Sequence, residues 1–225
     1  MVASASKAEA TCSRRMVMEI ERSEIISRVK RCMDELTPDF DGTVEAEEGV
    51  LIDHYIDGVV DEQLRLLLMT APVSLLPVGE VGSLYTPAPR ADGSGRIRLD
   101  EEVMRPVLLQ IKGWKVPVTR FIDERHPLYE LQFSRYTRGG ATKPVAVYTQ
   151  DGQGNRVIDY FSLPATATTH QIESLQCVPS PNEKSATYSL DPLLADALCY
   201  RCAAAVYNIM GNKPMADIML SRVAV

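Results

Sequence analysis

The sequence lacks an apolar run long enough to cross a membrane. Its best candidate, LRLLLMTAPVSLL, is interrupted by Pro72 and Ser74, whereas a spanning helix needs about 20 predominantly apolar residues. Arg14 and Arg15 near the start are followed by acidic residues, where a secretion signal would have an apolar region. We therefore expect neither membrane insertion nor secretion.

Spacings typical of metal sites and catalytic nucleophiles are also missing. The three histidines, His54, His126 and His170, are far apart, and no HxxxH, HExxH or GxSxG pattern is present. The glycine-rich DGQGN lacks the following GK[ST] of a phosphate loop. Asp123 and Glu124 are adjacent carboxylates, which we interpret as a solvated loop. The sequence predicts no catalytic, cofactor-binding or metal residues, and a protein that is not an enzyme.

Cysteine is scarce, with five residues at irregular spacing. An odd, irregular set fits a reducing compartment better than a disulfide framework. Cys199 and Cys202 form a CxxC pattern, but within a continuous helical segment and without a second pair or a nearby histidine. A redox motif would open a helix after a strand. We therefore expect both thiols to pack on a buried helix face, and we favour that reading over redox chemistry.

Aromatic residues make up 6% of the chain, and the single tryptophan, Trp114, stands in the unusually polar IKGWKVPVTR. Residues 111–145 contain seven basic and three acidic residues, a net charge of +4, which leaves −10 for the rest of a chain whose total is −6. Basic and aromatic residues together indicate a protein interface or a single-stranded nucleic-acid platform. The acidic remainder favours the interface, because it repels a polyanion. The interface candidates here are Trp114, Lys115, Arg120, Tyr129, Arg135 and Tyr136. Alternatively, Trp114 covers the β-layer of its own chain.

Periodicity predicts an α+β fold with N-terminal helices, a central antiparallel β-layer and C-terminal helices. We expect a disordered tail over 1–18 and a single domain over 19–225. Within that domain, 19–72 should be helical, 73–180 mainly β with a short helix near 127–137, and 189–225 a helical assembly segment. The expected strands are 96–99, 105–111, a hairpin of two strands around DGQGN, and 171–178. We expect DEEVM, between the first two strands, to form a turn of helix.

The C-terminal segment divides at residues 211–214, where Gly and Pro interrupt the helical pattern. Before the break, we expect the inner helix face to include Leu194, Leu198, Cys202, Ala205 and Ile209. After it, MADIMLSRVAV has an apolar stripe of Met215, Ile218, Met219 and Val223 with little sequence left to cover it. Methionine suits a surface that adapts to a partner. We therefore add Met215, Ile218 and Met219 to the interface candidates, as an assembly element that moves separately.

Two stretches carry a family resemblance. The stretches that carry the likeness follow a helical N-terminus and read GWKVPVTRFIDERHPLYELQFSRYTRGGATKPVAVY and LLADALCYRCAAAVYNIMGN. The chain resembles the head-to-tail adaptor, or connector ring, proteins of short-tailed crAss-like bacteriophages and related Bacteroidetes prophages. The likeness covers about residues 19–222. Its strongest parts are GWKVPV, the spaced HPLY, YTRG and KPV, and the alanine-rich C-terminal helix.

The resemblance implies a structural virion protein at the head-tail junction, made in the cytoplasm of the bacterial host. Such a subunit forms a ring, typically of twelve copies, that docks beneath the portal protein and continues the DNA channel towards a downstream tail protein. It implies no catalytic residue and no cofactor, and genomic DNA passes without specific binding. Trp114 would then be a rigid anchor between neighbouring copies. The alternatives are a single-stranded nucleic-acid-binding module and a non-viral protein-interaction domain.

Overall fold

The computed structural model describes residues 18–34, 46–134, 136–167 and 169–223, and in these the chain has the predicted α+β class. The helices are α1 (Arg22–Asp34), α2 (Ala46–Thr70), α3 (Pro127–Leu131), α4 (Pro192–Ile209) and α5 (Lys213–Ser221). The strands are β1 (Met18–Glu21), β2 (Gly79–Glu80), β3 (Ala88–Pro89), β4 (Gly95–Arg98), β5 (Val103–Ile111), β6 (Ala146–Gln150), β7 (Arg156–Tyr160), β8 (Ile172–Pro179) and β9 (Thr187–Leu190).

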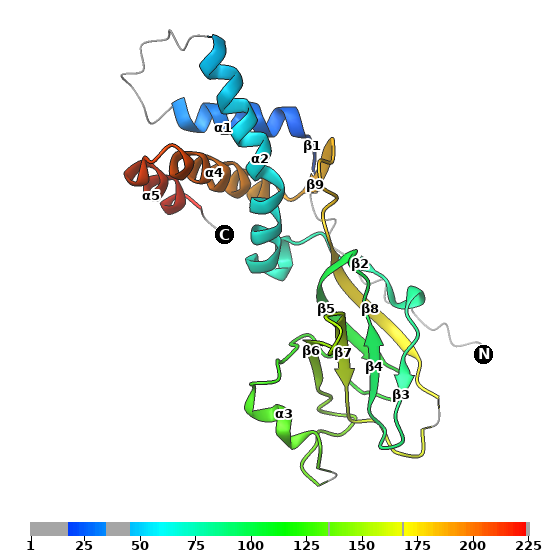
Figure 1. Cartoon of the computed structure of the whole chain (residues 1–225). Helices are drawn as coiled ribbons and strands as arrows, with labels where there is room; N and C mark the ends of the chain where they lie inside the picture. Colours follow the sequence, from blue (N-terminus) through cyan, green and yellow to red (C-terminus); the bar gives the residue numbers. More distant parts are fainter. Residues whose placement is uncertain (1–17, 35–45, 135, 168, 224–225) are drawn as a thin grey trace, which may run out of the picture.

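The β part of the molecule contains two antiparallel sheets (Figure 1). One has the strand order β3-β4-β7-β6 and the other β2-β8-β5. The hairpin predicted around DGQGN is β6–β7, with Ala146 opposite Tyr160. In its turn, Asp151 accepts two backbone N–H hydrogen bonds at 2.9 Å, and Gly154 has a φ of 85°, which glycine adopts without steric cost. The predicted hairpin and the predicted strand over 171–178 are confirmed.

The helical part contains α1, α2, α4 and α5, with the short β1–β9 pair beside them (Figure 1). Their inner faces form one hydrophobic cluster, in which Ile25, Ile56 and Leu198 are fully buried. Val107 of β5 and Val178 of β8 belong to the same cluster. The helices and the end of the β5–β8 pair therefore share a core, and burial of these apolar side chains stabilises their contact.

The C-terminal helices have the predicted break between them, but the second helix is not the separately moving segment that was predicted. Asp191 caps α4 by accepting a backbone N–H hydrogen bond at 2.9 Å, and Gly211, with a φ of 76°, follows its end. The next helix, α5, packs on α4, and Met219 is fully buried in the helical cluster. Met215 packs against the same cluster, whereas Ile218 is 42% exposed. The prediction of an uncovered stripe is therefore wrong for Met219, because the helical cluster covers it.

The strand β1 differs from the prediction, which placed Met18 in a tail and the next residues in a helical region. It pairs with β9, so that Met18 lies opposite Leu190 and Ile20 opposite Tyr188, and Ile20 is fully buried. This strand depends on a partner from the other end of the chain, and local periodicity therefore carries no signal for it. The remainder of the predicted tail, residues 1–17, lies outside the described residues.

Two details of the predicted helices are also wrong. The helix expected near 127–137 ends at Leu131, where the hydroxyl of Thr137 donates to the Leu131 carbonyl at 2.8 Å and so takes up a carbonyl that a longer helix would have bonded internally. Turns follow it in the described residues. On α4, Ile209 is 53% exposed although it was expected on the inner face, which instead continues through Val206.

An ionic network joins α1, α2 and β9. The guanidinium of Arg22 donates hydrogen bonds to the carboxylates of Asp57 and Asp61, at 2.5 and 2.9 Å. The hydroxyl of Tyr188 donates to Asp61 at 2.7 Å. Burial opposes the negative charge of Asp61, but the hydrogen bonds from Arg22, Tyr188 and the Lys184 N–H outweigh it and hold its pKa below the ordinary value. The network therefore favours the packing of α1 and β9 against α2.

Candidate protein-binding surfaces

Trp114 lies in the core of the β part and is 5% exposed. Gly113 before it has a φ of 103°, and the turn carries the indole onto Tyr160, edge to face, with ring centroids 6.2 Å apart. The side-chain amide of Gln110 donates to the Trp114 carbonyl at 2.9 Å. The expectation of an exposed anchor is therefore wrong, and the alternative, that Trp114 covers the β-layer of its own chain, describes its position.

The loops around Trp114 form an exposed end of the β part, which we call the distal tip and define as residues 112–117, 133–134 and 136–143. Lys115 donates its backbone N–H to the Ala141 carbonyl at 2.8 Å, which joins the two loops. Phe133 is 64% exposed and Tyr136 is 94% exposed. This tip lies at the end of the β part away from the helices, below α3 in Figure 1. Arg135, another predicted interface residue, lies outside the described residues.

The charges of the distal tip are largely unpaired. Lys115 and Lys143 are exposed, and neither has an ion pair among the described residues. Arg138 reaches a carboxylate oxygen of Asp92 only at 3.9 Å. The tip therefore combines unpaired lysines with exposed aromatic rings. The sequence predicts this combination for the segment, and only Trp114 departs from it, because it is buried.

Two further interface candidates lie beside the tip rather than on it. Tyr129 of α3 is half-buried, with its ring 5.0 Å from that of Phe133, and burial raises its pKa. Arg120 is exposed and lines a pocket between β5, β6 and the end of α2. The structure therefore spreads the candidates of residues 111–145 over the tip, the pocket and the core.

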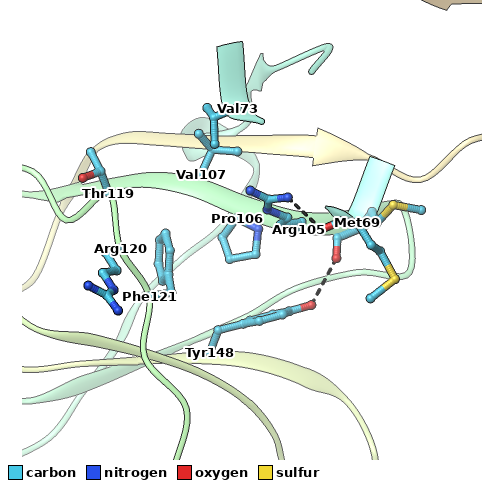
Figure 2. Close-up of a pocket in the computed structure, with 10 residues that line it drawn as sticks. Met69, Val73, Arg105, Pro106, Val107, Thr119, Arg120, Phe121 and Tyr148 are labelled. Atoms are coloured by element: carbon cyan, nitrogen blue, oxygen red, sulfur yellow. Dashed lines mark hydrogen bonds between the residues drawn. The ribbon is translucent and has the colours of Figure 1, made fainter. Parts of the chain in front are cut away.

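The pocket beside Arg120 has a volume of about 360 Å³. Figure 2 shows Phe121 and Met69 on its walls, with Arg105 reaching from β5 towards the end of α2. Arg105 donates to the Met69 carbonyl at 2.8 Å, and the hydroxyl of Tyr148 donates to a backbone carbonyl of β5 at 3.3 Å. These polar groups already have protein partners, so the pocket offers a ligand mainly apolar contacts.

A larger groove of about 1130 Å³ shares Met69, Met104 and Tyr148 with this pocket. We call it the acidic groove, because the residues that line it include Asp100, Glu101, Glu102 and Glu183. Glu183 pairs with Arg65 at 3.0 Å, and Tyr85 donates its hydroxyl to Asp100 at 3.2 Å. Glu101 and Glu102 are exposed and have no side-chain hydrogen bond or ion pair among the described residues.

Sequence reasoning missed the acidic groove. The stretch DEEVM was expected to form a turn of helix, whereas residues 101–102 form a turn and β5 begins at Val103. The groove also needs Arg65 of α2 and Glu183 of the loop before β9, which are far apart in the sequence. The run of three acidic residues, Asp100 to Glu102, can be seen in the sequence, but only the fold places it on the wall of the groove.

The two adjacent carboxylates and two of the three histidines singled out in the sequence have structural partners. Asp123 accepts a hydrogen bond from a backbone N–H in its own loop at 2.9 Å, and Glu124 accepts from the Thr149 hydroxyl at 2.8 Å. His126 caps α3, and His170 lies 2.6 Å from the Tyr160 hydroxyl. These contacts agree with the reading of the two carboxylates as part of a loop.

Cys199 and Cys202 are buried in the helical cluster, as predicted from their helical spacing. Burial raises the pKa of Cys199 to about 12 and also raises that of Cys202. Their thiols are therefore protonated at neutral pH, which disfavours nucleophilic or metal-binding chemistry. In the described part of the chain, no group of His, Cys, Asp and Glu is arranged to hold a metal ion.

Comparison with known proteins assigns the chain to no family. No protein-family model matches the sequence, and no curated protein is significantly similar to it. The connector resemblance therefore rests on the sequence motifs quoted above. None of the helices among the described residues combines the length and apolarity that a membrane span needs.

Proposed function

We propose that this protein is a non-enzymatic structural subunit of a virion, in the head-to-tail connector ring of a short-tailed phage. The observation that carries the proposal is the distal tip, which exposes Phe133 and Tyr136 beside the unpaired Lys115 and Lys143. Aromatic anchors beside cations are typical of protein interfaces. Residues 113–148, which include most of this tip, also carry the resemblance to connector proteins.

In this proposal the chain forms a ring, of twelve copies by the family resemblance, beneath the portal protein. The ring lies at the head-tail junction of the virion and continues the DNA channel towards a downstream tail protein. The net charge of −6 supports this role, because an acidic or neutral channel wall does not hold the phosphate backbone of the passing genome.

Single-stranded nucleic-acid binding is the second candidate, and the same tip favours it. Exposed rings such as Tyr136 offer stacking faces for bases, and neighbouring lysines attract phosphates. Against it stands the charge of −10 outside residues 111–145, which repels a polyanion at long range. A protein-interaction domain outside a virion would use the same surface and differ only in its partner.

The deciding experiment combines the purified protein with a portal ring from the same genome, followed by sedimentation and electron microscopy. We expect a second ring on the portal, with loss of docking in the tip variant Tyr136→Ser/Lys115→Glu. His54→Ala, at an exposed position on α2, is the control and should dock normally. Absence of any portal binding, together with tight, salt-sensitive binding of a labelled single-stranded oligonucleotide, would favour the nucleic-acid module instead.

A further inference from the structure

The distal tip and the acidic groove lie at opposite ends of the same strand. Val103, at the start of β5, lines the groove, and Ile111, at its end, leads directly into the first loop of the tip. The eight steps from Val103 to Ile111, at about 3.3 Å each, separate the two surfaces by roughly 26 Å. Within one chain they therefore cannot contact each other, but two copies placed head to tail can bring them together.

Their charges are complementary. The tip carries Lys115 and Lys143, and the groove carries Glu101 and Glu102, and none of the four has an ion pair among the described residues. Opposite potentials on two surfaces steer association and fix its register. Unpaired charges of opposite sign at the two ends of one part of the molecule favour a second copy as the partner.

The size and lining of the groove fit a protein segment. Its volume of about 1130 Å³ lies above the roughly 300–1,000 Å³ of common small-molecule sites. Met69 and Leu84 on its walls are 60% and 72% exposed, and they offer apolar contact area. The exposed rings of Phe133 and Tyr136 on the tip supply side chains that such walls can bury.

We infer that the acidic groove of one copy binds the distal tip of the next copy. The contact joins two different surfaces, so a bound pair of copies retains one free groove and one free tip, and repetition gives a closed ring or a filament. The inference rests on the proposed function in one respect, since a connector ring needs a contact of this type. It does not depend on the portal, and it can be tested without it.

The test uses three charge-reversal variants of the full chain at exposed positions. The groove variant is Glu101→Lys/Glu102→Lys, the tip variant is Lys115→Glu/Lys143→Glu, and the third combines all four changes. A matched control, Glu19→Lys/Asp217→Lys, alters the net charge as the groove variant does, but at exposed positions in the helical part. Circular dichroism and thermal unfolding establish that each variant folds, and analytical ultracentrifugation measures its self-association.

We expect the wild-type protein and the control to self-associate more at low salt than at high salt. The reason is that the Debye screening length, over which charges attract each other, falls from about 10 Å at 0.1 M salt to about 3 Å at 1 M. Each single-surface variant should associate roughly tenfold more weakly or not at all, because attraction becomes repulsion. A mixture of the two should associate about as strongly as the wild-type protein and grow into larger species, because the unchanged tip of one meets the unchanged groove of the other and the reversed groove meets the reversed tip. The four-residue variant should regain association.

Wild-type protein that stays monomeric at the highest soluble concentration would overturn the inference and leave the groove for another occupant, such as the portal. Association that groove reversal does not weaken, or a mixture of the two variants that associates no better than either alone, would also overturn it. If the groove variant still forms a complete ring on the portal, this contact is wrong and the connector proposal stands. If the wild-type protein associates through tip and groove but no portal binds, the connector proposal is wrong and this contact stands.

Discussion

Replacing Met219 by alanine tests whether α5 belongs to the core or is a separate docking element. The interpretation drawn from sequence left Met219 on an uncovered apolar stripe of a segment that moves separately, whereas in the structure it is 0% exposed. Its side chain packs in the same cluster as Leu198 and Cys202 of α4. Truncation therefore removes buried contacts and leaves a cavity between helices.

The expected loss in free energy of unfolding is about 2–5 kcal/mol, the range for large-to-alanine changes at buried sites. A loss of about 3 kcal/mol corresponds to a melting temperature lower by roughly 6–12 °C in a chain of this size. Ile218→Ala on the same helix is the matched control. Ile218 is 42% exposed, and alanine has the higher helix propensity, so this change should cost less than about 1 kcal/mol.

Urea unfolding followed by far-UV circular dichroism measures both variants, and the fluorescence of Trp114 reports on the β part in the same titration. Coincident transitions of the two signals would support a two-state analysis. Deleting residues 214–225 should destabilise the helical part for the same reason. Equal and small losses for Met219→Ala and Ile218→Ala would refute the packing argument and restore α5 as a mobile docking segment.

Three further predictions concern single side chains. The lowered pKa of Asp61 contributes stability that is complete above the unfolded-state pKa of about 3.9 and is lost as the pH falls through the folded-state pKa. In urea titrations at several pH values, Asp61→Asn should therefore be less stable than the wild-type protein at neutral pH, and its stability should depend less on acid. An unchanged pH dependence would contradict this. Trp114 should be quenched weakly by iodide in the folded protein and strongly in urea; strong quenching before unfolding would place it on the surface. Cys199 and Cys202 should resist a thiol reagent at mildly alkaline pH until the chain unfolds, because burial raises both pKa values; rapid modification of both in the folded state would argue against their packing.

The parts of the fold that were predictable depend on neighbours in the sequence. The β6–β7 hairpin follows from alternating strands around DGQGN, where Asp151 and Gly154 have the side chain and the backbone freedom that the turn needs. The helix α4 follows from its apolar periodicity and from Asp191 and Pro192 at its start. The burial of Cys199 and Cys202 follows from the same periodicity. Each of these signals lies within a few residues of the structure that it specifies.

What lies against a given side chain was decided by the tertiary structure alone. Lysines around Trp114 indicated a surface loop, but the positive φ of Gly113 turns the indole into the core. The apolar stripe of α5 was visible in the sequence, whereas its cover, α4, became known only from the packing of the two helices. The acidic groove likewise needs Arg65 and Glu183 brought together from distant segments. Sequence periodicity specifies which side chains share a face, while burial and charge pairing depend on the elements that the completed fold places against that face.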